Sequence, residues 1–144
     1  NDVCAVIVEC LQGVGGLDES TTSFYKRLHD LCRKFNVVLI ADEVQSGFGR
    51  TGDFFAFQKH KITTDIISMA KGMGNGFPIG GILIHPKIKA SFGLLGTTFG
   101  GNHLACTASL TVLEVISFLA KFLGLLPDSL LSAVPDLLKK LRIS

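Results

Sequence analysis

Three ionisable side chains each stand at the end of a short apolar run. They are Glu9, Asp42 and Lys71, at the ends of the runs over residues 3–9, 37–41 and 65–70. Short apolar runs rich in β-branched residues are typical of buried strands. In an open α/β sheet, ligands bind beyond the carboxyl ends of the strands. The pattern therefore predicts that two acids and one amine share one rim of a sheet.

Asp42 has a side chain that could act on a ring ligand. A carboxylate beside a pyridine nitrogen keeps that nitrogen protonated, because opposite charges favour each other's ionised forms. A protonated ring of this kind is an electron sink. A helix N-cap and a metal ligand are the other roles open to an acid at this position. Gln45, three residues further on, could hydrogen-bond a phenolic oxygen of the same ligand or lie on the surface.

Lys71 precedes a cluster of glycines over residues 72–76. An amine at a strand end can reach an aldehyde and form an imine, and partial burial or a neighbouring positive charge would activate it. The alternatives are a solvated lysine at the start of a loop and a nucleotide-binding domain that uses this loop. A phosphate-binding P-loop needs its lysine after the glycines, so that pattern fails here.

Thr97 and Thr98 lie in a second glycine loop, over residues 96–101, which opens onto a predicted helix over about residues 103–121. Hydroxyl groups and free backbone N–H groups at a helix N-terminus suit a phosphate group. Plain helix capping is the competing interpretation.

The remaining segments complete an α/β pattern. Helices are expected over about residues 21–35 and 128–142, a short helix over 54–60, a helical turn over 86–92 and a fourth strand over 80–84. In the first of these helices, the apolar positions Phe24, Leu28, Leu31, Cys32 and Phe35 are spaced as one face. Pro135 should break or begin an element in the last helix. Strands that are continuous apolar runs favour a sheet covered on both faces.

Composition limits the classes of function. Of the 144 residues, 47% are hydrophobic and 18% charged, which suits one folded domain with a sizeable core. The formal net charge of +2 gives no electrostatic footprint for nucleic acid or an anionic membrane. The four scattered cysteines favour a reducing, cytoplasmic compartment over a disulfide framework or a zinc site. Glu114 and Lys121 interrupt the apolar stretch over residues 110–126, so we expect a buried helix there and no membrane span.

Four motifs, in order and correctly spaced, carry a resemblance to a known family. They are VIVECLQGVGG (6–16), LIADEVQSGFGRTG (39–52), DIISMAKGMGNGFPIGG (65–81) and GTTFGGNHLAC (96–106). Together they resemble the class III (subgroup II) aminotransferases, of the acetylornithine/succinylornithine type, over about residues 3–116. The resemblance implies fold type I of the pyridoxal-phosphate (PLP) transferases, an α/β fold whose mostly parallel sheet has helices on both faces.

The resemblance also implies roles for particular residues. Asp42 would hold the pyridine nitrogen of PLP, and Gln45 would lie by its phenolic oxygen. Lys71 would form the Schiff base and, once freed, move the proton as general base and then acid. Glu9 would contact the substrate.

Thr98, with Thr97 beside it, would bind the phosphate of the cofactor in a neighbouring subunit, which implies a homodimer with shared active sites. The implied activity is transfer of an amino group from an acylornithine-like or other ω-amino donor to a 2-oxo acid such as 2-oxoglutarate. An ornithine or 4-aminobutyrate type of transaminase is the alternative within the family, and an inactive remnant that keeps the fold is the alternative outside enzymes.

Three positions depart from the family pattern. Cys10 stands in place of a proline, His103 in place of another, and Val14 in place of a glutamate that masks a substrate-binding arginine. Val14 therefore leaves the amino donor open. The family's upstream phosphate loop and its C-terminal small domain are also not in this chain, so we expect a fragment. We expect a cofactor-binding segment over residues 1–121 and a divergent helical tail over 122–144.

Overall fold

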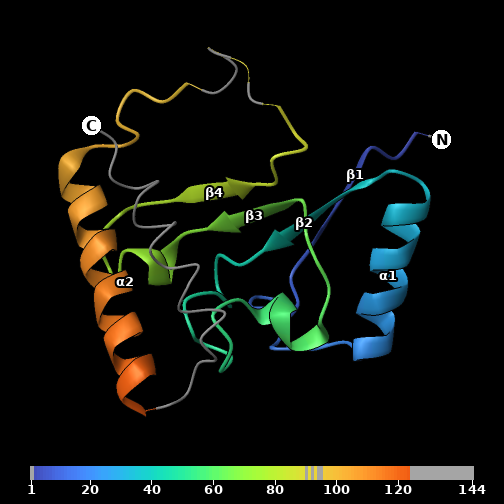
Figure 1. Ribbon diagram of the computed structural model, residues 1–144, viewed down its shortest axis with the longest axis horizontal. Coiled ribbons are helices and arrows are strands. Elements are labelled where there is room, and N and C mark those ends of the chain that lie inside the picture. Colours follow the sequence, from blue (N-terminus) through green and yellow to red (C-terminus); the bar gives the residue numbers. More distant parts are fainter. Residues whose placement is uncertain (1, 90, 92, 94–95, 124–144) are drawn as a thin grey trace. The chain divides into compact units, whose positions relative to one another are not determined.

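The computed structural model describes residues 2–89, 91, 93 and 96–123 (Figure 1). The chain divides into two compact units. The first is formed by residues 1–70 and 80–89, and the second by residues 71–79 and 90–144. Each unit is described by itself below.

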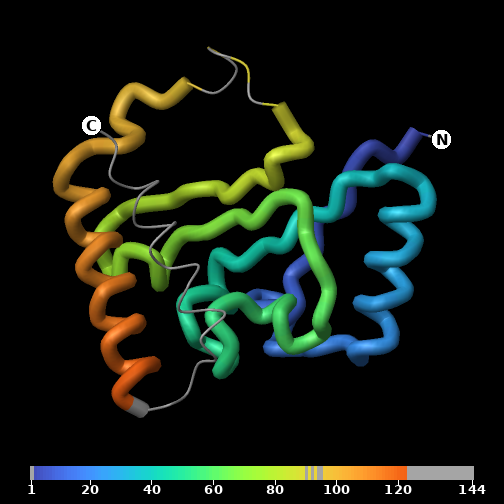
Figure 2. Tube along the Cα trace, viewed as in Figure 1, coloured from blue at the N-terminus to red at the C-terminus, as the bar shows by residue number. Residues whose placement is uncertain are grey.

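The first unit is built on a four-stranded sheet with the order β1-β2-β3-β4. Its strands are β1 (Ala5–Val8), β2 (Val38–Asp42), β3 (Ile66–Met69) and β4 (Gly81–Ile84). The pairs β1–β2 and β2–β3 are parallel, and β4 pairs antiparallel with β3. Figure 2 shows these strands running side by side along the Cα trace. All four predicted strands and the mostly parallel α/β sheet are confirmed, with Asp42 as the last residue of β2 and not the residue after it.

The helix α1 (Thr22–Lys34) begins where predicted, because the hydroxyl of Thr21 accepts a hydrogen bond from the N–H of Phe24 at 3.2 Å. Its buried side chains are Tyr25 and Cys32. Of the predicted apolar face, Cys32 is buried, whereas Phe24, Leu31 and Phe35 are about half exposed. Apolar spacing marked one side of the helix, but the aromatic ring of Tyr25 lies on the side that is buried.

A buried carboxylate, Glu43, organises the segment that follows β2. Its Oε2 accepts hydrogen bonds from the hydroxyl of Ser46 at 2.7 Å and the N–H of Ala56 at 3.0 Å, and its Oε1 accepts one from the N–H of Phe57 at 3.0 Å. These bonds hold the start of η1 (Ala56–His60), a 3-10 helix in the place of the short helix predicted over residues 54–60. They tie η1 to the turn directly after β2.

The second unit contains η2 (Lys71–Met73), a single 3-10 turn, and the helix α2 (His103–Leu123). The side chain of Asn102 caps α2 by accepting a hydrogen bond from the N–H of Ala105 at 2.9 Å. The expectation of a buried helix is only partly met. Ala105, Ser109, Leu113 and Ala120 are buried, whereas Leu104, Val115, Phe118, Leu119 and Phe122 are exposed. In length and composition alone, the stretch His103–Phe122 is also apolar enough to cross a membrane.

Three expectations concern the end of the chain or its least regular loop. A helical turn was predicted over residues 86–92. Residues 86–87 form a turn, in which the N–H of Ile88 donates to the carbonyl of His85 at 2.9 Å, and residues 90 and 92 lie outside the described residues. The predicted helix over 128–142, with Pro135, also lies outside them. The division of the chain at residues 121 and 122 stays a prediction.

Candidate active site

Asp42, the last residue of β2, has one oxygen engaged and one free. Its Oδ1 accepts hydrogen bonds from the N–H of Val44 and from the hydroxyl of Ser68 on β3, both at 3.1 Å. Within the part of the chain that the structure describes, nothing donates to its Oδ2. The bond from Val44 spans two residues and stabilises the turn after the strand. Asp42 therefore caps a turn through Oδ1, in place of the helix N-terminus named as an alternative. The half-buried carboxylate keeps one oxygen for a ligand.

Gln45 and Glu9 lie on two loops that meet at Gly13. A Cβ at Gly13 would overlap Nε2 of Gln45, so the glutamine amide lies directly on the glycine backbone. The carboxylate of Glu9 accepts a hydrogen bond from the N–H of Gly13 at 3.0 Å. The structure therefore brings the loop after β1 and the turn after β2 together, as strand-end placement predicted. Glu9 braces its own loop, and the predicted contact with substrate stays a prediction.

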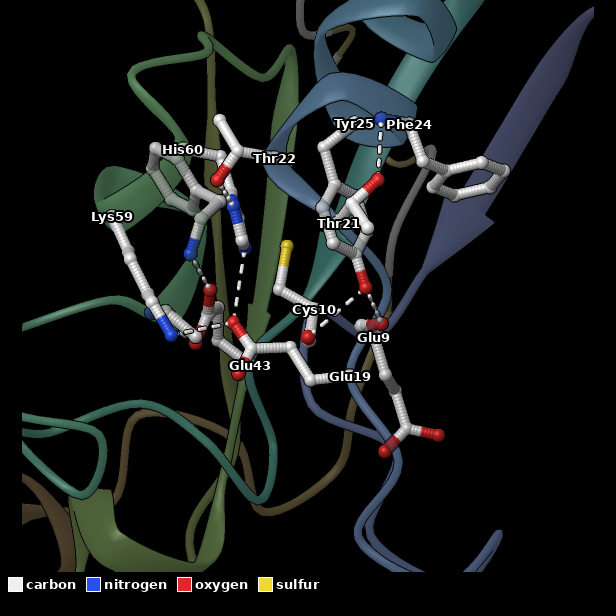
Figure 3. A network of polar contacts seen from close by, with 12 residues as sticks. Glu9, Cys10, Glu19, Thr21, Thr22, Phe24, Tyr25, Glu43, Lys59 and His60 are labelled. Carbon is white, nitrogen blue, oxygen red and sulfur yellow. Dashed lines mark hydrogen bonds and ion pairs between the residues drawn. The ribbon is translucent and has the colours of Figure 1, made fainter.

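Tyr25, the one tyrosine of the chain, anchors the same loop from α1 (Figure 3). Its hydroxyl donates to the carbonyl of Cys10 at 3.0 Å, and its ring lies on that of His60 with centroids 4.2 Å apart. Burial, with lesser contributions from Glu43 and Glu19, raises the pKa of the Cys10 thiol to about 12, so it stays a neutral core group. Sequence reasoning missed Tyr25, because nothing in its spacing marks a contact with the strand-end loop.

The ring of His60 is buried at the end of η1 and bonded to the first residue of α1 (Figure 3). Its Nδ1 lies 3.0 Å from the hydroxyl of Thr22, and its Nε2 lies 3.7 Å from Glu19, which Lys59 binds at 2.7 Å. Burial lowers the pKa of His60 more than the negative charge of Glu19 raises it. A neutral His60 therefore joins α1 to η1 as a structural group.

Lys71 begins η2 in the second unit with an exposed side chain and an unusual backbone. Its φ is 43°, in the left-handed region that non-glycine residues seldom adopt. Its carbonyl accepts hydrogen bonds from the N–H groups of Gly74 and Asn75, both at 3.1 Å. A Cβ at Gly74 would overlap the carbonyl of Phe77, so only glycine fits there. Backbone strain of this kind concentrates at functional sites, where surrounding structure enforces it.

Thr97 and Thr98 belong to the loop before α2 in the second unit. The hydroxyl of Thr97 accepts a hydrogen bond from the N–H of Gly100 at 3.1 Å, so it closes its own turn. In the described ranges, the exposed hydroxyl of Thr98 has no hydrogen-bond partner and is available to a ligand. This difference agrees with the greater weight that the motif gives to Thr98 as the phosphate ligand.

These residues have the chemistry that PLP requires. Asp42 has a free carboxylate oxygen for a ring nitrogen, Lys71 an exposed amine for an aldehyde, and Thr98 a free hydroxyl for a phosphate group. Across residues 2–89, 91, 93 and 96–123, no group of three or more His, Cys, Asp or Glu side chains could hold a metal ion. The donor set therefore fits the cofactor, and in that part of the chain Asp42 belongs to no such group of three.

Comparison with known proteins identifies the family. The family described as aminotransferase class-III matches residues 1–126. Acetylornithine aminotransferase of Methanocaldococcus jannaschii is 48% identical over 119 residues, which is 81% of this chain and 30% of that protein. The enzyme of the same name from Aquifex aeolicus is 44% identical over 117 residues, or 80% of this chain and 31% of that one. The chain thus spans about a third of the length of these relatives.

Solved structures agree with the sequence comparisons. The ornithine delta-aminotransferase of Plasmodium falciparum superposes with a TM-score of 0.74 at 37% identity, over 79% of this chain and 30% of that one. A PLP-bound amine transaminase from an uncultivated Pseudomonas species gives 0.73 at 33% identity, over 78% and 28%. The implied fold type I and the PLP dependence of the family are confirmed. The chain belongs to the class-III aminotransferases, a family of PLP-dependent enzymes.

Proposed function

We propose that this chain forms part of an aminotransferase that moves an amino group from an acylornithine-like donor to a 2-oxo acid such as 2-oxoglutarate. The observation that carries the proposal is the carboxylate of Asp42. It is fixed at the carboxyl end of a central parallel strand, where Oδ1 accepts from Ser68 on β3 and from the N–H of Val44 in the following turn, and no residue that the structure describes donates to Oδ2. Ligands of open α/β sheets bind at that edge.

Each site residue has one task in this proposal. PLP bound here would supply an electron sink to the amino donor. Asp42 would bind the ring nitrogen and keep it protonated, because its negative charge favours the charged ring. Gln45 would donate to the phenolic oxygen from its place on Gly13, and Thr98 would bind a phosphate group. Lys71 would attach the cofactor and, once freed, carry the proton between carbon atoms as a general base and then as a general acid.

The choice of amino donor rests on the relatives and on one loop. Curated relatives named acetylornithine aminotransferase reach 44–48% identity, whereas ornithine aminotransferase structures reach 36–37%. Val14, at 96% exposure in the loop of Glu9, replaces the charged side chain of the family pattern. An apolar side chain there suits an acylated donor better than one with a free second amine. Ornithine and 4-aminobutyrate types are the second candidates.

Two wider properties belong to the same proposal. A homodimer would let Thr98 reach the cofactor of the neighbouring subunit, and the exposed hydroxyl of Thr98, without a hydrogen-bond partner among the described residues, is compatible with that role. The four cysteines are all unpaired, and Cys4 is exposed, which suits a reducing cytoplasmic compartment. Analytical ultracentrifugation of the full-length enzyme would test the dimer, and a fluorescent fusion of it would test the compartment.

An absorbance titration with PLP, followed by borohydride reduction, tests the proposal directly. We expect a visible band that reduction fixes covalently, with peptide mapping to Lys71, and we expect Lys71→Ala to lose it. Lys61→Ala is a matched control, because Lys61 is another exposed lysine with a positive φ, here 54°. No band in the wild-type chain, or equal labelling in Lys71→Ala, would refute the assignment.

Separate additions of N-acetylornithine, ornithine and 4-aminobutyrate would then identify the donor. We expect the visible band to shift fastest with N-acetylornithine. A faster response to ornithine would support the second candidate. A stable band that none of the three amines changes would support an inactive remnant that keeps the cofactor site.

A further inference from the structure

Ser68 faces Asp42 across the sheet. The two residues are register partners in the parallel pair β2–β3, so their side chains leave the sheet on the same face. The hydroxyl of Ser68 lies 3.1 Å from Oδ1 of Asp42 and 3.5 Å from the carbonyl of Ala41. The carboxylate is both the nearer and the charged acceptor, so the single hydroxyl proton goes to Asp42.

The backbone fixes this pair as firmly as the side chains do. The N–H of Glu43 donates to the carbonyl of Ser68 at 3.0 Å, which extends the ladder one residue beyond Asp42. The N–H of Val44 then donates to the same Oδ1 at 3.1 Å. Two donors, one on β3 and one in the turn after β2, therefore converge on one oxygen of one carboxylate.

Convergence on one oxygen has a geometric consequence. The terminal torsion of an aspartate is broad and nearly two-fold, so a carboxylate with no donors exchanges its oxygens freely. Two donors on Oδ1 remove that freedom and leave Oδ2 directed away from both. Within the residues that the structure describes, no other donor reaches Oδ2, so its lone pairs remain available to an N–H⁺ group.

We infer that Ser68 is a positioning residue, which holds Oδ1 of Asp42 so that Oδ2 meets the pyridine nitrogen of PLP. This inference rests on the proposed function and extends it from strand ends to a residue within β3. Ser68 itself touches no cofactor atom in this scheme. Its effect on the cofactor passes entirely through Asp42.

A mutant cycle on PLP affinity tests the inference. We expect Ser68→Ala to raise the dissociation constant of PLP about three- to tenfold, the effect of losing one hydrogen bond that is worth about 1 kcal/mol and acts on the cofactor only through Asp42. In an Asp42→Ala background, the same change should have no further effect, because the residue through which it acts is gone. Ser68→Thr keeps the hydroxyl and should restore wild-type affinity.

The pH titration of the visible band adds a readout that a merely structural role would not move. A less firmly held Asp42 leaves the ring nitrogen less protonated, so the ring withdraws fewer electrons from the imine at Lys71. The midpoint of the titration should therefore rise in Ser68→Ala and stay unchanged in Ser68→Thr. Urea unfolding of every variant shows which variants are folded. Affinities for PLP are then compared only among those folded variants.

The possible outcomes distinguish a failure of the role inferred for Ser68 from a failure of the proposed aminotransferase function. A wild-type chain that forms no band refutes the proposed function and the inference with it. A normal wild-type band with unchanged affinity and midpoint in Ser68→Ala refutes the inference alone. An effect of Ser68→Ala that persists in the Asp42→Ala background also refutes it, because the serine would then act by another route.

Discussion

The backbone at Lys71 has a φ of 43°, and its amine is the proposed attachment point of the cofactor. A left-handed conformation costs an L-residue about 1 kcal/mol, a cost that glycine avoids. The chain accepts this cost where the carbonyl of Lys71 must receive two N–H groups of the following glycine turn. Strain at this position is therefore part of how the lysine leaves the strand.

This strain predicts an unusual order of stabilities at Lys71. We expect Lys71→Gly to be more stable than Lys71→Ala by about 1 kcal/mol, measured by urea unfolding. Lys26, an exposed residue within α1, is the matched control, where Lys26→Gly should be less stable than Lys26→Ala by about 1 kcal/mol. The same order at both positions would contradict the left-handed assignment.

At Gly13, the close approach of Gln45 predicts a functional effect with little loss of stability. A Cβ there would overlap the end of the Gln45 side chain, which is flexible and can move aside. Gly13→Ala should therefore weaken PLP binding to the same degree as Gln45→Ala, while unfolding free energy changes by less than about 1 kcal/mol. Gly80→Ala is the control, because a Cβ at Gly80 comes no closer than 3.4 Å to any neighbour. Unchanged affinity in Gly13→Ala would separate Gln45 from the cofactor.

Strand-end residues could be predicted from the sequence, whereas their supporting contacts could not. Apolar runs show where strands end, and this was enough to select Asp42 and Lys71. Ser68 lies inside such a run, and its contact with Asp42 depends on the register between two strands. Register and helix rotation are set by packing in three dimensions, so Ser68 and Tyr25 carried no local signal.

At the level of elements, Asp65 connects α1, β2 and the segment after β4. Its carboxylate accepts hydrogen bonds from Arg33 at 2.7 Å and from the N–H of Leu39 at 2.8 Å, and it pairs with Lys87. Burial alone would raise the pKa of Asp65, but the bonds from Lys87, Leu39 and Arg33 outweigh it and lower the pKa from 3.8 to about 2. One buried acid thus joins three segments, each of which is distant from it in sequence.

The lowered pKa fixes the direction of the pH dependence. Asp65 binds a proton more readily in the unfolded chain than in the folded one, so its contribution is complete above pH 3.8 and is lost as the pH falls toward 2. That contribution is about 2 kcal/mol. Asp65→Asn should lower the free energy of unfolding at neutral pH by at least that amount. It should also reduce the fall in this free energy between pH 3.8 and pH 2. Asp30→Asn, at an exposed site, is the control. The same loss of unfolding free energy in acid in Asp65→Asn and in the wild type would contradict the assignment.

The sequence pattern predicted the bounds of the strands and of α1 to within a few residues. It did not predict the direction of β4 or which side of α1 is covered. The run over residues 80–84 gave no sign that β4 would pair antiparallel with β3. Helical spacing likewise grouped Phe24 and Leu31 on one face without showing how far that face is covered, and both are about half exposed. Periodicity reports which residues share a side, and the neighbouring elements decide which side is covered.

At the scale of the whole molecule, large apolar side chains are exposed on the described parts of both units. On the sheet, Ile7, Ile82 and Ile84 are exposed, and on α2 the same is true of Leu104, Phe118 and Phe122. The chain spans about a third of the length of its relatives, and the family fold has further segments in which such side chains can be covered. Exposed apolar surface of this extent favours association.

The rings of Phe118 and Phe122 stack with centroids 6.1 Å apart on the exposed side of α2, which makes them the best test of that association. Replacing both with Gln should lower dye binding by 8-anilinonaphthalene-1-sulfonate and the average mass in sedimentation, with stability changed by less than about 1 kcal/mol. Leu113→Ala, at the fully buried side of the same helix, should instead cost about 2–5 kcal/mol. If α2 instead spanned a membrane, the wild-type chain would partition into phospholipid vesicles and the double variant would not. Association that the two Gln substitutions leave unchanged, with no vesicle binding, would place the responsible surface on the sheet.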